Sequence, residues 1–244
     1  LDRCLNYRHH CRYLWMSIES KASEDHRSLS RRLSRARGRK VHALAWSARD
    51  PRRSFGATMN AFEQKFGEKL SNGARWAAFS WMYEHLRNLG TPISIVETGT
   101  ARQRGNYEGD GQSTIVFDWM LQEFGGTGIS IDLSLDAVGV ARSQVQRMTV
   151  IHGDSITILR GLSDMDRVNL VYLDSYDWTG GYDAALHHAG ELAAIFSRLS
   201  PGCVIAVDDC ISRTNGKHML VAAMLREMGM MPVLESHITI WIKG

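Results

Sequence analysis

Beyond residue 55, short apolar runs alternate with stretches whose apolar residues recur at helical spacing. The runs have the length of strands and end at Gly, Pro or an acid, whereas the stretches repeat at i, i+3 and i+4. This pattern predicts strands at residues 93–97, 128–132, 148–152, 168–174, 203–208, 231–235 and 237–242. It predicts helices at residues 60–70, 73–89, 113–124, 134–145, 155–162, 182–199 and 216–228.

The order of these elements predicts the fold class. Continuous apolar strands separated by helices are typical of a parallel sheet covered on both faces. The last two strands have almost nothing between them, and a parallel crossover needs about a dozen residues, so this pair must be antiparallel. We therefore expect a three-layer, Rossmann-like α/β domain with a seven-stranded sheet, mostly parallel with an antiparallel C-terminal strand.

Charge divides the chain into two parts. Residues 1–54 hold 14 Lys and Arg against 5 Asp and Glu, a net charge of +9, and residues 55–244 hold 15 against 21, a net charge of −6. We predict a basic, partly disordered N-terminal arm at 1–54 and a folded domain at 55–244. A solvated arm is favoured over contact with nucleic acid or an anionic membrane, because no nucleic-acid-binding motif accompanies the charge.

The remaining composition is that of an ordinary globular chain. Hydrophobic residues make up 44% of it, no apolar run is long enough to span a membrane, and no secretory signal is expected. Four cysteines are too few for a disulfide scaffold in 244 residues, which favours reduced thiols and a cytoplasmic location. The oligomeric state stays open, and a homo-oligomer is one possibility.

Two strand ends carry the first sign of chemistry. The strand at 93–97 ends in Glu97-Thr98-Gly99-Thr100, an acid followed by a glycine turn, and the strand at 128–132 ends in Asp132. Nucleotide-type ligands bind at the carboxyl ends of parallel strands, where an acid on the second strand reaches the ribose hydroxyls. An ionised carboxylate only accepts hydrogen bonds, so Asp132 suits a ribose diol.

These motifs, with the expected C-terminal hairpin, resemble the class I S-adenosylmethionine-dependent methyltransferases. The resemblance runs from about Asn60 to the end, and it is strongest to the branch with macrocin-type sugar O-methyltransferases and cephalosporin-hydroxylase-like proteins. Catechol O-methyltransferases share the site plan more distantly. The resemblance implies S-adenosylmethionine as cofactor and a hydroxyl of a small molecule or sugar-like metabolite as acceptor.

The resemblance also implies roles for individual residues. Residues Glu97, Thr98, Gly99 and Thr100 would hold the methionine part of the cofactor. Gly111-Gln112-Ser113-Thr114 would open a helix whose N–H groups face the cofactor carboxylate, although the insertion at 101–110 departs from the family and is either a lid or part of the substrate site. Asp154 and Ser155 match the adenine-side loop, with helix N-capping as the alternative.

Three further acids end neighbouring strands. Asp174 follows the strand at 168–174, and Asp208 and Asp209 follow the strand at 203–208, so all three should meet at one edge of the sheet. Clustered carboxylates repel unless a cation lies among them, and oxygen-only ligands favour a hard ion such as Mg²⁺. We therefore predict a divalent-metal site at these residues, with helix capping as the alternative.

The base that removes the acceptor proton is less clearly marked. The family commonly has Asp-Gly-x-His after the fourth strand, whereas this chain has Asp174-Ser175-Tyr176-Asp177. Asp177 is the predicted base, acting beside Asp174, and His218 is the alternative.

Three rival functions stay open on the sequence alone. An oxidoreductase is disfavoured because no Gly-x-Gly-x-x-Gly follows the first strand. A non-catalytic or differently catalytic member of the same fold, such as a cephalosporin-hydroxylase-like protein, remains possible because fold does not establish function. A nucleic-acid-associated methyltransferase using the basic arm is disfavoured, because the fourth strand is not followed by a base-flipping motif.

Overall fold

The computed structural model describes residues 59–90 and 92–244, so the predicted arm and the predicted domain start at residue 55 lie outside the described residues. The helices are α2 (Ala61–Leu70), α3 (Trp76–Leu89), α4 (Ser113–Phe124), α5 (Leu135–Arg142), α6 (Ser155–Gly161), α7 (Asp183–Ile195) and α8 (Met219–Glu227), with short 3₁₀ turns at Met165–Arg167 and Phe196–Arg198. The strands are β1 (Ile93–Thr98), β2 (Gly126–Asp132), β3 (Met148–His152), β4 (Leu170–Leu173), β5 (Val204–Val207), β6 (Cys210–Ser212), β7 (Asn215–Gly216) and β8 (Thr239–Ile242).

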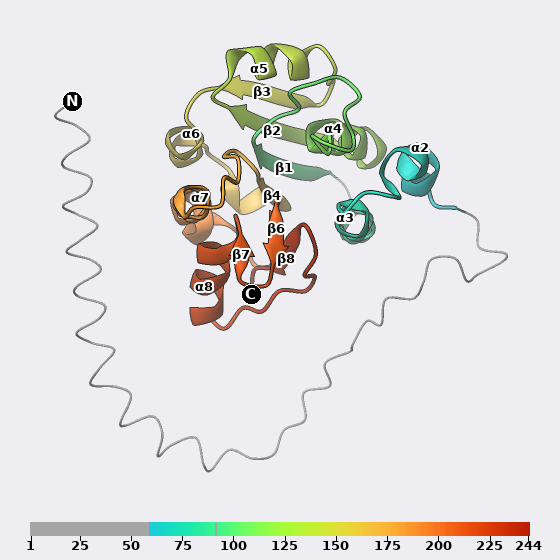
Figure 1. Ribbon diagram of the computed structural model, residues 1–244. Helices are drawn as coiled ribbons and strands as arrows, with labels where there is room; N and C mark the ends of the chain where they lie inside the picture. The colour runs from blue at the N-terminus through green and yellow to red at the C-terminus, as the bar shows by residue number, and fades with distance from the viewer. Residues whose placement is uncertain (1–58, 91) are drawn as a thin grey trace, which may run out of the picture. The chain divides into compact units, whose positions relative to one another are not determined.

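The main sheet has the strand order β3-β2-β1-β4-β5-β8 (Figure 1). Neighbouring strands from β3 to β5 run parallel, and β8 runs antiparallel to β5, with Val207 opposite Thr239. This confirms the predicted α/β class and the antiparallel C-terminal strand. Within the described residues the sheet has six strands rather than the predicted seven.

The missing strand is the one predicted at residues 231–235. This segment forms only an isolated bridge between Leu234 and Ile240. Pro232 has no N–H to contribute to a ladder, and Met231 and Val233 are exposed, so the segment lacks the two buried faces of a central strand. A short hairpin of β6 and β7, which the sequence pattern does not predict, follows β5 instead.

Alternation along the strands builds one apolar core on each face of the sheet. Leu170 and Tyr172 of β4 pack in a cluster with side chains of α2, α3 and α4. Val171 and Leu173 point the other way and pack with side chains of α6, α7 and α8. Figure 1 shows these two groups of helices on opposite sides of the sheet. Of the described helices, none is both long and apolar enough to cross a membrane.

Chain direction reverses at the centre of the sheet. From β1 the chain moves outward through β2 to β3, and it then returns to β4 on the other side of β1. In open α/β sheets, ligands bind in the crevice at the carboxyl ends of the strands beside such a switch point. The fold therefore directs attention to the loops after β1, β2, β4 and β5.

Candidate active site

A cavity of about 360 Å³ opens at the carboxyl ends of β1, β2 and β4. Gly99 has a φ of +81°, and a Cβ on it would lie 2.5 Å from the Asp174 carbonyl oxygen, so only glycine lets the two loops approach this closely. The cavity is lined by Gly99, Thr100, Arg102, Asp110, Ser113, Asp132, Leu133, Ser134, Asp174, Ser175 and Asp177.

Behind this cavity lies a buried carboxylate without a hydrogen-bond partner. Glu97 is fully buried, and neither of its side-chain oxygens accepts a hydrogen bond from the described residues. Burial raises the pKa of Glu97 to about 7, although the nearby hydroxyls of Ser113, Ser130 and Thr114 partly offset this rise. A buried, unpartnered carboxylate is costly, and a ligand cation would satisfy it.

Helix α4 begins beside Glu97, at Ser113, and its N-terminus has no side-chain cap. The residue before it, Gln112, adopts a left-handed conformation and uses its side chain to organise the 101–110 insertion. Its amide nitrogen donates to the Gln103 carbonyl at 2.7 Å and to Asp110 at 2.8 Å. No side chain among the described residues caps the start of α4, and such a helix N-terminus favours an anion; binding of the cofactor carboxylate there stays a prediction.

Asp132 ends β2 at the cavity, as predicted, and its two oxygens hold the loops on either side. One accepts from the Thr100 backbone N–H at 3.0 Å, and the other accepts from the Ser134 backbone N–H at 2.7 Å. Each carboxylate oxygen has a second lone pair, so the residue can still accept hydrogen bonds from a diol.

Several predicted cofactor residues do not line the cavity. Gly111 packs against the side chain of Arg75, and Asp154 caps α6 by accepting from the Thr157 backbone N–H at 2.8 Å. Asp154 thus takes the capping role that the sequence left open. Its part in adenine binding stays a prediction.

Thr98 and Ser155 do not line the cavity either. The buried carboxylate of Glu191 connects them. Glu191 of α7 accepts from the Thr98 hydroxyl at 3.2 Å and from the Ser175 hydroxyl at 2.5 Å, and it contacts His187 at 3.3 Å. His187 in turn contacts the Ser155 hydroxyl at 3.0 Å. Burial opposes ionisation of Glu191, but the His187 contact and the hydroxyls lower its pKa.

The three predicted strand-end acids meet, and two basic side chains lie among them. We call these five residues the charged cluster: Asp174, Asp208, Asp209, Arg75 and Lys217. The Arg75 Nε lies 2.7 Å from Asp208, and its Nη2 lies 3.0 Å from Asp209. The Lys217 ammonium lies 2.9 Å from Asp209 and also pairs with Asp174. The sequence predicts the clustering of the acids correctly, but it does not predict the two cations.

Electrostatics in the charged cluster follow from these contacts. Burial lowers the pKa of Lys217, but Asp174 and Asp209 more than reverse this and keep the ammonium charged. Burial and the neighbouring Asp208 raise the pKa of Asp174 well above its usual value, with Lys217 opposing the rise. Burial also opposes ionisation of Asp209, but contacts with His237, Lys217 and Arg75 lower its pKa.

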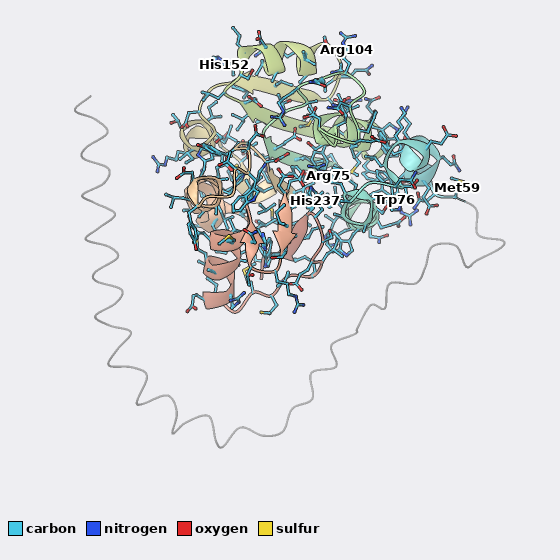
Figure 2. The ribbon with its side chains drawn as sticks, in the orientation of Figure 1. Met59, Arg75, Trp76, Arg104, His152 and His237 are labelled. Carbon is cyan, nitrogen blue, oxygen red and sulfur yellow. The ribbon has the colours of Figure 1, made fainter. Side chains whose placement is uncertain are left out.

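His237, just before β8, completes the surroundings of the acids. Its Nε2 lies 3.1 Å from Asp209 and 3.6 Å from Asp208, and Figure 2 shows it beside Arg75, which comes from the start of α3. Asp208, Asp209 and His237 have candidate metal-ligand atoms within 4.8 Å of one another. A metal at this spot would thus have donors close at hand, provided that their lone pairs were free.

The two candidate bases lie in different surroundings. Asp177 lines the cavity, but its side chain is 69% exposed and both of its oxygens accept from Arg102 at 3.1 Å. His218 is buried away from the cavity, its Nδ1 has no partner among the described residues, and burial lowers its pKa. Asp174, the other acid predicted to be catalytic, lines the cavity directly.

A second, larger cavity of about 630 Å³ lies beyond the charged cluster. It is lined by Cys210, Ile211, Ser212, Arg213, His218, Glu235, Ser236, His237 and Thr239, most of them polar. His237 contacts Asp209, Lys217 joins Asp209 to Asp174, and Asp174 lines the first cavity. An unbroken chain of ionisable side chains therefore connects the two cavities.

Sequence reasoning missed Arg75, Lys217, His237 and Glu191. Only Lys217 carried a usable signal, because it stands beside the candidate His218 at the start of a helix that follows an acidic strand end. Arg75 and Glu191 lie in predicted helices, and His237 begins the strand predicted at residues 237–242, so none of them is marked by a motif.

Comparison with known proteins identifies the fold. Neither a protein-family model nor a curated protein matches this sequence. Among solved structures, the O-methyltransferase NovP is 13% identical, with 70% of this chain and 79% of NovP covered at a TM-score of 0.52. The calicheamicin methyltransferase CalS11 is also 13% identical, with 78% and 88% covered at a TM-score of 0.51. The chain therefore has the fold of class I methyltransferases, with the site described above at its strand ends.

Proposed function

We propose that this protein is an S-adenosylmethionine-dependent O-methyltransferase that acts on a hydroxyl of a small, polar, sugar-like molecule. The observation that carries the proposal is the buried, unpartnered Glu97 carboxylate behind a cavity at the switch point of the sheet. Among ligands of this fold, S-adenosylmethionine combines an ammonium group, a carboxylate and a ribose diol, and each of these has a complementary group here.

The cofactor-binding residues follow from this fit. Glu97 would pair with the ammonium, the uncapped start of α4 with the carboxylate, and Asp132 with the ribose hydroxyls. When bound, S-adenosylmethionine supplies an electrophilic methyl group on a sulfonium. The chain's own task is then to place an acceptor oxygen in line with that methyl and to take up the hydroxyl proton.

The second cavity is the proposed site for the remainder of the acceptor, whose reacting hydroxyl would lie beside Asp174 in the first cavity. Its Ser, Thr, His, Arg and Glu side chains suit a ligand with several hydroxyl groups, and its volume accommodates more than a single sugar ring. NovP is described as an O-methyltransferase, which supports oxygen as the methylated atom.

Asp174 is the proposed proton acceptor. It lines the cofactor cavity, and its Oδ2 has no hydrogen-bond partner among the described residues, whereas both oxygens of Asp177 are held by Arg102. Asp174 would take up the hydroxyl proton as the acceptor oxygen receives the methyl group, which bound S-adenosylmethionine would supply from its sulfonium and so leave as a thioether.

The predicted Mg²⁺ assistance is not carried into this proposal. Each oxygen of Asp208 already accepts a hydrogen bond from within the protein: Oδ1 from the Asp209 backbone N–H, and Oδ2 from Arg75 and the Tyr172 hydroxyl. Both oxygens of Asp209 are also occupied, Oδ1 by Arg75 and His237 and Oδ2 by Lys217. These contacts leave little room in the coordination shell of a divalent ion.

Methyl transfer from labelled S-adenosylmethionine to a panel of glycosides and nucleotide sugars tests the proposal. We expect turnover on at least one such acceptor, none on RNA, and a loss of about 100-fold or more in rate in Asp174→Asn. The variant should bind S-adenosylmethionine as the native protein does. Cofactor binding without turnover on any hydroxyl acceptor would favour a non-catalytic member of the fold, and methylation of RNA alone would replace the acceptor assignment.

A further inference from the structure

The charged cluster already contains the cations that its carboxylates require. Asp174, Asp208 and Asp209 bring three carboxyl groups to one edge of the sheet, and Arg75 and Lys217 contribute two positive charges at ion-pair distance. Three anions with no cation would repel strongly, which is the usual argument for a metal. Here the protein itself supplies the compensating charge.

Lys217 occupies the position that an ion shared by Asp174 and Asp209 would take. Its side chain is 1% exposed, and its ammonium lies between Asp174 Oδ1 and Asp209 Oδ2. A Mg²⁺ ion bound to these acids would contact their oxygens directly, at about 2.1 Å. It would then share two carboxylates with a buried ammonium, and the two positive charges would repel at short range.

The position of Lys217 is also fixed by the backbone. Its N–H donates to the Asp209 carbonyl at 3.3 Å, and Gly216 before it approaches the same segment so closely that a Cβ would lie 2.6 Å from the Asp209 carbonyl oxygen. A buried ammonium is stable only when it is paired, and both of its partners come from strand-end loops. The lysine is therefore a built-in part of the cluster.

We propose that Lys217 replaces the divalent ion of metal-dependent methyltransferases, and that with Arg75 it holds Asp174, Asp208 and Asp209 in place so that the protein works without a metal. Lys217 is a positioning residue in this scheme, because it is buried and would act through Asp174, which lines the first cavity. The inference rests on the proposed function only where it concerns catalysis. Whether Lys217 or a metal ion occupies the charged cluster can be measured without any assay of methyl transfer.

Binding of Mn²⁺, followed by electron paramagnetic resonance, tests the replacement directly. We expect the native protein to bind no Mn²⁺ at the cluster, because Lys217 takes up Asp174 Oδ1 and Asp209 Oδ2. Lys217→Ala frees both oxygens and opens space between them, so it should bind one Mn²⁺ with an affinity at least about tenfold above that of the native protein.

Thermal unfolding provides a second readout, which is the rescue of the variant by metal. Loss of a merely structural lysine would lower the unfolding temperature but would not make it depend on metal. Lys217→Ala should unfold at a lower temperature than the native protein, and Mn²⁺ or Mg²⁺ should restore part of the loss in the variant while leaving the native protein unchanged. Lys65→Ala is the matched control, because Lys65 is an exposed lysine of α2 outside the cluster. If Lys217→Ala does not fold even with metal, Lys217→Gln is measured in the same way.

Two results would overturn the proposal. Binding of Mn²⁺ by the native protein, lost in Asp209→Asn, would show that the cluster is a metal site after all. Absence of Mn²⁺ binding in both the native protein and the Lys217 variants would show that the lysine does not occupy an ion's position. Neither result depends on S-adenosylmethionine, whose binding to the same preparations separates failure of this inference from failure of the proposed function.

Discussion

At the scale of single residues, the buried carboxylate of Glu97 carries the proposed function. A glutamate that is fully buried and lacks a hydrogen-bond partner destabilises the fold when it is ionised. Its retention at the end of β1 is understandable if a ligand ammonium pairs with it. Glu97 is thus a residue at which stability and binding are expected to oppose each other.

This opposition gives a prediction for pH. The pKa of Glu97 is about 7 in the folded protein against 4.5 ordinarily, so between these values the unfolded chain has lost the proton that the folded protein keeps. Stability should therefore fall as pH rises through this window, by up to about 3 kcal/mol. Glu97→Gln should remove this fall, be the more stable protein at about pH 8, and bind S-adenosylmethionine more weakly. Urea unfolding at several pH values, followed by cofactor titration, measures both effects.

Parallel stability–pH curves for the native protein and Glu97→Gln would contradict this account. Glu63→Gln is a suitable control, because Glu63 lies on the helix α2, only partly buried, and its side chain accepts a capping hydrogen bond instead.

At the scale of elements, the site depends on the close approach of the loops after β1 and β4. Gly99 N–H donates to the Ile131 carbonyl at 2.8 Å, and the Asp174 N–H donates to the Thr98 carbonyl at 2.9 Å. These bonds continue the sheet just past its strands and bring Asp132 and Asp174 to the same cavity. The geometry of the cavity is therefore set by backbone pairing, with little freedom in the loops.

A comparison of Gly90 and Gly99 distinguishes the cost of backbone strain from the cost of close packing. Gly90, which ends α3, and Gly99 have similar φ values of +83° and +81°, but a Cβ on Gly90 would meet nothing within 4 Å. Gly90→Ala should cost about 1 kcal/mol in unfolding free energy, from the left-handed conformation alone. Gly99→Ala should cost at least about 2 kcal/mol more and weaken cofactor binding, because the loop after β4 must move. Equal costs in urea unfolding would show that the loops are not tightly packed here.

At the scale of the whole molecule, the local sequence pattern predicts the sheet, but it does not predict the basic side chains at the edge of the sheet. Apolar runs ending in Glu97, Asp132, Asp174 and Asp208 mark both the strands and the edge where their acids meet, because parallel strands share one carboxyl end. The seventh strand was predicted wrongly because its apolar residues are not buried on both faces, which a single sequence does not reveal.

The cations could not be found in this way. Arg75 reaches Asp208 across 133 positions of sequence, and Lys217 reaches Asp174 across 43, from segments that carry no motif of their own. Their contacts depend on how α3 and the β6–β7 hairpin pack against the sheet, which is a property of the assembled fold. The same limit applies to Glu191, which from the interior of α7 contacts Thr98 at the end of β1 and Ser175 after β4.

The central claim is that S-adenosylmethionine binds at the carboxyl ends of β1 and β2. Calorimetric titration of the cofactor into the native protein, Asp132→Asn and the control Asp136→Asn tests it most directly, because Asp136 is an exposed acid in the first turn of α5 nearby. The account predicts binding by the native protein and Asp136→Asn, with or without Mg²⁺, and a loss of affinity of about tenfold or more in Asp132→Asn. Equal binding by all three proteins, or no binding by the native protein, would contradict it.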